Sequence, residues 1–262
     1  MKIDLTGKLA FISGSSKGIG YAIAQSLREA GARVIVHGRK RETIEPIARQ
    51  LGDDVHFVYG DLADGAAAQD VVRQLEEIGK VDILVNNAGI YEHKQFMEIP
   101  DSDWNRFWET NVMSCIRMTR ALLPHMLEQN WGRVVIISSE SAFNIPVDMI
   151  HYGVTKTALQ GLSRGVAETT RGTGVTVNTV LPGPTLTEGS ADFIAKEAKA
   201  KGISQEEAEA NFIRDNRSSS LIWRFARVEE VASMVTYVVS PQASATNGSA
   251  LRVDGGVVNS IM

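Results

Sequence analysis

This sequence contains almost no cysteine, and no segment has the pattern of a membrane span. Cys115 is the single cysteine among 262 residues, which excludes a disulfide within the chain and argues against a cysteine-based metal site. No uninterrupted apolar run approaches the roughly 18 residues that suggest a membrane span. Residues 1–7 lack the apolar core of a secretory signal peptide. These absences predict a soluble protein of the reducing cytoplasm, without a membrane partner.

A basic excess is missing as well. The chain carries 27 Lys and Arg against 31 Asp and Glu, and its formal net charge is −4. Nucleic-acid binders usually show a basic stripe or patch, so we expect no nucleic-acid partner. The chain has five scattered histidines without metal-ligand spacing, so we expect no metal and assign most of the five to the surface or to helix caps; they are His37, His56, His93, His125 and His151.

Seven short apolar segments recur along the chain, at residues 9–13, 32–37, 55–59, 81–85, 133–137, 175–181 and 250–253. They are rich in Val and Ile and mostly do not alternate with polar residues, which is typical of strands covered on both faces. Helical patterns separate them, and repeated strand–helix units form parallel sheets with right-handed crossovers. We therefore predict one α/β domain over residues 1–262, a Rossmann-type doubly wound parallel sheet of about seven strands with helices on both faces.

The alternation of strands and helices is interrupted between Pro182 and Arg227, where no strand pattern occurs. A polar helical pattern covers residues 187–201 and ends at Gly202, and residues 204–207 fit a capping box that would start a second helix. This insertion would lie beyond the carboxyl end of a strand, where open α/β sheets bind ligands. We predict a helical substrate lid at about 184–225, with a subunit contact as the alternative.

A glycine-rich turn follows the first predicted strand, and an amphipathic helix follows the turn. Glycines there let the backbone approach a pyrophosphate, and the helix start offers free N–H groups. A turn that merely needs glycine backbone angles is the alternative. The strand before and the helix after favour a dinucleotide site, with contacts from Gly14, Ser16, Lys17, Gly18, Ile19 and Gly20.

The second strand indicates which dinucleotide is bound. NAD sites usually place an acidic residue after this strand, whereas an Arg there accommodates a 2′-phosphate. Residues 37–41 contain no acid, and Arg39 stands where the acid would be, with Lys17 in the nearby glycine turn. Two cations favour NADP(H), although solvated surface cations are the alternative and NAD(H) stays open.

Polar residues after the third and fourth strands complete the predicted cofactor contacts. Asp61, followed by Leu62, could accept from an adenine amino group or cap the next helix, and Asp64 could be that cap instead. After the fourth strand, Asn87, Ala88 and Gly89 could contact a ribose or tie the sheet together.

Four residues form a candidate catalytic set. Tyr152 and Lys156 are four apart and share one helix face. A neighbouring ammonium favours tyrosinate and would lower the pKa of Tyr152 toward neutrality. Ser139 follows the fifth strand and could bind a substrate carbonyl oxygen. Asn111 lies in a long helical run, residues 104–126, where its amide could hold a water in a proton relay toward Lys156.

These motifs in this order resemble the short-chain dehydrogenase/reductase family, including its 3-oxoacyl reductases, over essentially the whole chain. The resemblance implies that Asn111, Ser139, Tyr152 and Lys156 are the catalytic tetrad and that Lys156 also binds the nicotinamide ribose. It further implies cofactor contacts from Tyr152, Pro182, Gly183, Thr185 and Thr187. Ser13 departs from the family, which usually has Thr before the first glycine.

The resemblance implies an enzyme that moves a hydride between NADP(H) and a carbonyl or secondary alcohol, with Tyr152 as general acid or base. It also implies a homotetramer assembled through helices at roughly 104–128 and 152–171. A cofactor-binding regulatory or scaffold protein without catalysis is the second hypothesis, which the intact tetrad argues against. The substrate is not readable, and the sequence assigns no role to Glu140. His151 could shape the substrate pocket or influence a negatively charged group, or it could point to solvent from a helix start.

Overall fold

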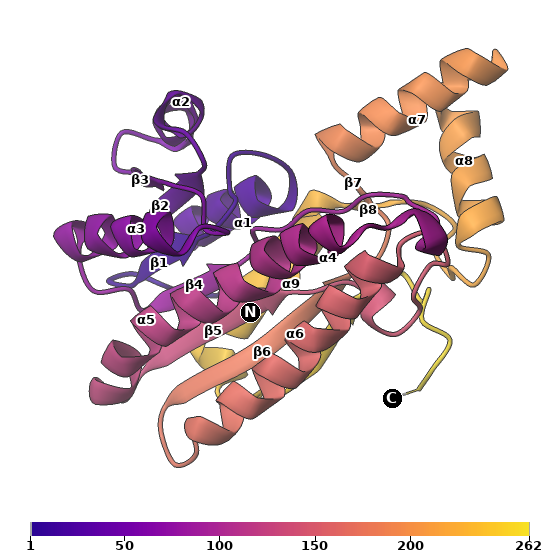
Figure 1. Cartoon of the computed structure of the whole chain (residues 1–262). Coiled ribbons are helices and arrows are strands. Elements are labelled where there is room, and N and C mark those ends of the chain that lie inside the picture. Colours follow the sequence, from indigo (N-terminus) through magenta and orange to yellow (C-terminus); the bar gives the residue numbers. More distant parts are fainter. Residues whose placement is uncertain (1, 262) are drawn as a thin grey trace.

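Residues 2–261 are described by a computed structural model, whose centre is a seven-stranded sheet (Figure 1). All neighbouring strands in it are parallel, in the order β3-β2-β1-β4-β5-β6-β9. The strands are β1 Leu9–Ile12, β2 Arg33–Gly38, β3 His56–Tyr59, β4 Ile83–Asn86, β5 Gly132–Ile137, β6 Val175–Pro182 and β9 Ala250–Val253. Each falls on one of the seven predicted segments, so the predicted fold class is confirmed.

Helices cover both faces of this sheet. One face carries α1 Gly18–Glu29, α2 Arg41–Leu51 and α9 Val228–Val239. The other carries α3 Gly65–Ile78, α5 Ser114–Glu128 and α6 Ile150–Thr169, which lie in front of the sheet in Figure 1. The buried apolar residues accordingly form two large clusters, one on each side of the strands. Aliphatic strands that bury both faces fix the sheet between these helical layers.

The order in which successive strands are added to the sheet reverses between β1 and β4, although all the strands stay parallel. From β1 the sheet extends through β2 and β3 on one side, and through β4 and β5 on the other. Connections leaving the two strands therefore diverge and open a crevice at their carboxyl ends. The hydroxyl of Ser13 closes the base of this crevice, since it accepts hydrogen bonds from the backbone N–H groups of Asn87 and Ala88.

The predicted helix over residues 104–126 is divided in the structure. It consists of α4 Asp101–Phe107, a π-helical segment Trp108–Met113 and α5. One extra residue per turn in a π-helical segment rotates the side chains that follow, and such segments are frequent at functional sites. Asn111 lies within it. Three single 3₁₀ turns occur at Phe96–Glu98, Glu140–Ala142 and Pro241–Ala243.

The insertion after β6 forms two helices that project from the sheet, α7 Glu188–Lys201 and α8 Gln205–Asn216 (Figure 1). They enclose a small apolar cluster of their own, which includes Ile194 and Ile213. The prediction of no strand here is wrong, because β7 Thr185–Leu186 pairs with β8 Ala226–Arg227 at the base. A strand of two residues is too short to give a recognisable pattern in the sequence.

The helix caps that the sequence predicts for α7 and α8 are only partly present in the structure. Thr187 caps α7 in a reciprocal capping box with Ser190, and Gly202 ends that helix in the left-handed conformation. Ser204 caps α8 by accepting from the Glu207 N–H, but the return bond expected from the Glu207 side chain is not formed. Within residues 2–261, no helix combines the length and the hydrophobicity needed to cross a membrane.

Candidate active site

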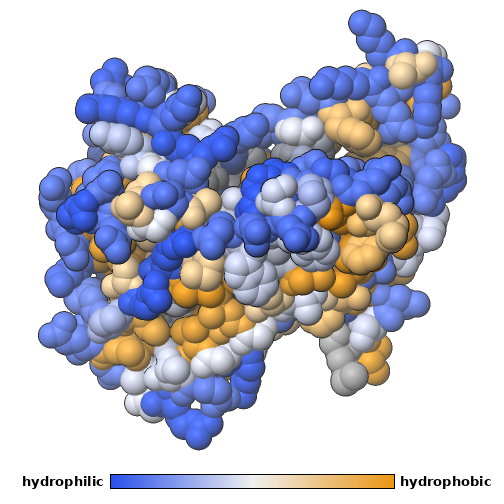
Figure 2. Space-filling view, in the orientation of Figure 1, coloured by the Kyte–Doolittle hydropathy of each residue, from blue (hydrophilic) through white to orange (hydrophobic). Residues whose placement is uncertain are grey.

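A cavity of about 790 Å³ opens at the carboxyl ends of the central strands, beside α7. Figure 2 shows the surface hollowed between the body of the sheet and the projecting helix pair. Every residue predicted to contact a cofactor lines this cavity, and so do Ser139, Tyr152 and Lys156. Asn111 is not at the wall but is buried behind it. The sequence therefore located the cavity, although the contacts themselves remain predictions.

The glycine turn has the shape that a bound pyrophosphate requires. Gly14 has a φ of +62°, and a Cβ there would lie 2.8 Å from the Cα of Ala88. A Cβ on Gly20 would lie 2.5 Å from the carbonyl oxygen of Gly14 and would also strike the Asn87 amide. Lys17 precedes α1 without a side-chain cap, which leaves the first N–H groups of that helix available to an anion.

His37 holds this turn in place, a role that the sequence reading missed. It is an exception to the expectation that most histidines are surface or capping residues, since only 2% of its surface is exposed. Its Nδ1 accepts from the Gly14 N–H at 3.0 Å, so Nε2 carries the proton and donates to the Gly60 carbonyl oxygen. Burial lowers the pKa of His37 to about 4, which keeps the imidazole neutral.

Two cations stand at the nucleotide end of the cavity. Lys17 and Arg39 are both exposed and both line the wall. Within residues 2–261 neither side chain forms a hydrogen bond or ion pair. Asp61 also lines the wall and accepts from the Ala63 N–H, whereas the cap of α3 is Asp64. The residues present thus fit a dinucleotide, with positive charge free to receive a phosphate.

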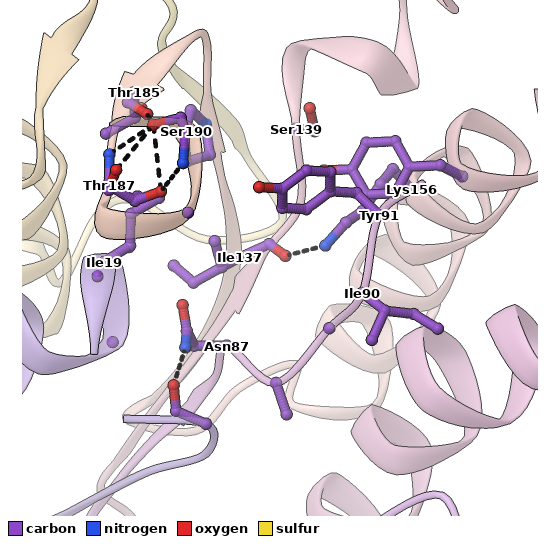
Figure 3. A pocket seen from close by; sticks show the side chains of 18 of the residues that line it. Ile19, Asn87, Ile90, Tyr91, Ile137, Ser139, Lys156, Thr185, Thr187 and Ser190 are labelled. Atoms are coloured by element: carbon purple, nitrogen blue, oxygen red, sulfur yellow. Dashed lines mark hydrogen bonds between the residues drawn. The ribbon is translucent and has the colours of Figure 1, made fainter. Parts of the chain in front are cut away.

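Tyr152, Lys156 and Ser139 converge at the other end. The first two lie one turn apart on α6, with the ammonium 5.5 Å from the centre of the phenol ring. The ammonium donates to the Ile137 carbonyl oxygen at 3.0 Å, as Figure 3 shows. Ser139 lies two residues beyond β5, and Tyr91 packs edge-on against the ring of Tyr152. Figure 3 places Ser139, Tyr91 and Lys156 opposite the turn that carries Thr185, Thr187 and Ser190.

Burial shifts the pKa values of Tyr152 and Lys156 and so sets their protonation. It raises the pKa of Tyr152 to about 12, which the nearby Ser139 hydroxyl only partly offsets. It lowers the pKa of Lys156 to about 8. The prediction that the ammonium brings the tyrosine toward neutral pKa is therefore wrong for the protein alone. Desolvation is the largest cause of the shift, and Tyr152 is a protonated phenol at neutral pH.

Asn111 is satisfied by the protein itself. Its amide nitrogen donates to the Ile90 carbonyl oxygen and to the Thr155 hydroxyl, and its amide oxygen accepts from the Ile90 N–H. Both amide hydrogens are used, so a water of the predicted relay would have to donate to the amide oxygen, which accepts only one hydrogen bond within the protein. The side chain ties the loop after β4 to α6, one residue before Lys156.

His151 is another correction, since it does not point to solvent. It is fully buried, with its ring 4.0 Å from that of Phe107 and 6.2 Å from that of Trp104. Burial lowers the pKa of His151 as well. A residue at a helix start that packs sideways against α4 gives no local sequence signal.

Comparison with known proteins agrees with this arrangement. The family model described as short chain dehydrogenase matches residues 8–198. The chain belongs to the short-chain dehydrogenase family. It is 45% identical over 263 residues to the oxidoreductase YvrD of Bacillus subtilis, covering all of both chains. It is 34% identical to the 3-oxoacyl-[acyl-carrier-protein] reductase FabG of Aquifex aeolicus, over 98% of this chain and 100% of that one.

Solved structures of other proteins superimpose closely on this one. L-sorbose reductase from Gluconobacter frateurii, complexed with NADPH and L-sorbose, superimposes with a TM-score of 0.94 at 31% identity over the full length of both chains. A 3-oxoacyl reductase from Agrobacterium tumefaciens with NADP bound gives 0.87 at 29% identity over 97% of this chain and 95% of that one. The protein is thus an oxidoreductase of the short-chain dehydrogenase family with a Rossmann fold. No cluster of three or more His, Cys, Asp or Glu side chains suited to a metal occurs in residues 2–261.

Proposed function

We propose that this short-chain dehydrogenase transfers a hydride between NADP(H) and a carbonyl or secondary alcohol substrate. The observation that carries the proposal is one continuous cavity, with the cations Lys17 and Arg39 at one end and Tyr152, Ser139 and Lys156 at the other. Such a cavity positions a dinucleotide and a small substrate end to end. The nicotinamide supplies the hydride when the cofactor is bound.

Side chains of the protein supply the proton for the substrate oxygen and orient the substrate. Tyr152 donates its phenolic proton to the substrate oxygen in reduction, and accepts it in oxidation. Ser139 donates a second hydrogen bond to that oxygen and sets its position. Lys156, close to the phenol ring and held by the Ile137 carbonyl, stabilises the phenolate that remains. Asn111 positions Lys156 through its bond to Thr155 on the same helix.

The choice of NADP(H) over NAD(H) rests on Lys17 and Arg39. Neither cation has a protein partner among the described residues, and a 2′-phosphate offers both of them charge-assisted hydrogen bonds. Solved relatives that carry NADPH or NADP support the same preference. We further propose that residues 1–262 form a single domain and that the segment at about 184–225 is the substrate lid. The cavity reaches Phe193 and Phe212 of that segment.

Oxidation of NADPH and NADH, followed at 340 nm across a chemically diverse panel of ketones and aldehydes, tests the proposal. We expect turnover with NADPH and a kcat/KM with NADH that is lower by at least tenfold. Arg39→Ala should narrow that gap by raising the KM for NADPH. Equal use of both cofactors would refute the preference. Tight NADPH binding without reduction of any carbonyl would favour the regulatory or scaffold hypothesis.

A further inference from the structure

A buried carboxylate beside the catalytic serine has no assigned role. Glu140 follows Ser139 directly, is only 2% exposed and lines the cavity. Its Oε1 accepts from the Nε of Arg217 at 2.9 Å, whereas its Oε2 is buried and has no hydrogen-bond partner among residues 2–261. Leaving a buried charged oxygen without a donor is costly, so the site favours a donor that arrives from the cavity.

Arg217 comes from the opposite side of the cavity. It follows the last residue of α8, lines the same cavity and is only 15% exposed at its side chain. Its Nε binds Glu140 and its Nη1 donates to the Asn216 carbonyl oxygen. None of the hydrogen bonds formed within residues 2–261 uses Nη2. The ion pair therefore leaves one acceptor and one donor without a partner among residues 2–261, on two segments 77 residues apart.

The pair lies within electrostatic reach of the reacting group. Glu140 raises and Arg217 lowers the pKa of Tyr152, and Tyr152 donates the proton to the substrate oxygen in the mechanism above. Glu140 directly follows Ser139 and both line the cavity, so a substrate whose carbonyl meets Tyr152 and Ser139 has Glu140 beside its neighbouring carbon atoms. Burial raises the pKa of Glu140, and Arg217 and the neighbouring Ser141 only partly oppose this; Ser141 forms no hydrogen bond with Oε2 in this structure.

We propose that Glu140 and Arg217 recognise a hydroxyl group next to the reacting carbonyl, so that the substrate class is neutral polyhydroxylated ketones and aldehydes. This inference rests on the proposed function and specifies its substrate. A hydroxyl donates to the free oxygen of Glu140 and accepts from the free nitrogen of Arg217. The two charges already balance each other, which fits a neutral ligand better than an anionic one. A ketone without the hydroxyl leaves the carboxylate oxygen desolvated and is rejected.

A purely structural role is the competing explanation, because the same ion pair joins the segment after β5 to the end of α8. Two ketones separate the two roles, 2-hydroxycyclohexanone and 2-methylcyclohexanone, which have similar size and differ in the hydroxyl. The readout is the ratio of their kcat/KM values with NADPH. Since the hydroxyl also alters the reactivity of the carbonyl, the change of this ratio on mutation is what counts.

We expect Glu140→Met to lower the ratio by about tenfold to a hundredfold, the usual effect of losing a hydrogen bond to a charged group. Glu140→Gln, which keeps the size and one acceptor, should lower it less. The control is Glu230→Gln, which breaks a carboxylate–arginine pair with Arg224 outside the cavity and should leave the ratio unchanged. Wild-type enzyme should also reduce D-fructose, a ketohexose.

Three results would overturn the inference. An equal loss of activity on both ketones, with the ratio unchanged, would make the pair a structural tether only. An unchanged ratio together with weaker NADPH binding, measured by NADPH fluorescence, would place the contact on the cofactor. Reduction of 2-methylcyclohexanone without any preference for hydroxylated ketones would refute the substrate class while leaving the proposed function intact. If the wild-type enzyme reduces no ketone, the proposed function itself fails and the inference with it.

Discussion

Burial governs the chemistry of the side chains that meet at the cavity. Tyr152 and Lys156 are driven in opposite directions, to pKa values of about 12 and about 8. Both shifts favour the neutral form, because a desolvated site penalises charge of either sign. A neutral phenol is a competent proton donor, so reduction starts from the protonation state that the fold already imposes. The role of Lys156 is then to make the phenolate less costly once the proton has left.

His37 gives a pH dependence that can be measured. Its pKa is about 4 in the folded protein and about 6.5 when unfolded, so the unfolded chain binds more protons between these values. Stability is therefore full above about pH 6.5 and falls as the pH drops toward 4. From the size of the shift, we expect a loss of about 2 kcal/mol between pH 7.5 and pH 4.5.

Urea unfolding of the wild type and of His37→Gln at both pH values checks this effect. Gln offers one acceptor and one donor to the same neighbours but does not titrate, so its loss of stability on acidification should be smaller. Parallel losses in the two proteins would show that His37 is not the acid-sensitive group.

At the scale of elements, the tight contact between α1 and β4 can be tested with a matched pair of glycines. A Cβ on Gly20 would meet the Gly14 oxygen and the Asn87 amide, whereas a Cβ on Gly161 of α6 has nothing within 4 Å. Both positions are helical, so both alanines gain about 1 kcal/mol of helix propensity. We expect Gly20→Ala to weaken NADPH binding at least tenfold and to lower Tm, while Gly161→Ala retains binding. Equal NADPH affinity in the two variants, by fluorescence titration, would contradict the close approach.

The strands and most helices could be predicted from sequence because their signals are local. Aliphatic runs, the glycine turn and Tyr152 with Lys156 each lie within a few residues. Contacts between distant segments gave no such signal. Glu140 and Arg217 are 77 positions apart, and His37 reaches Gly14 and Gly60 across three strands. The two-residue strands β7 and β8 and the π-helical segment were missed because tertiary packing, rather than periodicity, defines them.

For the whole molecule, the predicted homotetramer has a testable surface. Figure 2 shows apolar residues gathered over α5 and α6. Trp108 of the π-helical segment before α5 is 42% exposed, and Val154 of α6 is 38% exposed. A patch of this kind is typical of an interface between subunits. We expect light scattering after gel filtration to give four times the 28.5 kDa chain mass. Val154→Glu should lower the measured mass of the particle, and Gln25→Glu, at an exposed position of α1, should leave it unchanged. A wild-type monomer would refute the assembly.

The central claim is that Tyr152 supplies the proton in a site where most of the cofactor contacts come from other residues. Tyr152→Phe removes only the phenolic oxygen, and the glycine turn, Lys17 and Arg39 are untouched. The decisive measurement is kcat on a reducible ketone beside the Kd for NADPH, in wild type and in this variant. We predict that kcat falls by at least a thousandfold while Kd changes by less than about threefold, as expected for loss of a positioned general acid. A variant that keeps most of its turnover, or one that loses NADPH binding together with activity, would contradict the assignment of Tyr152.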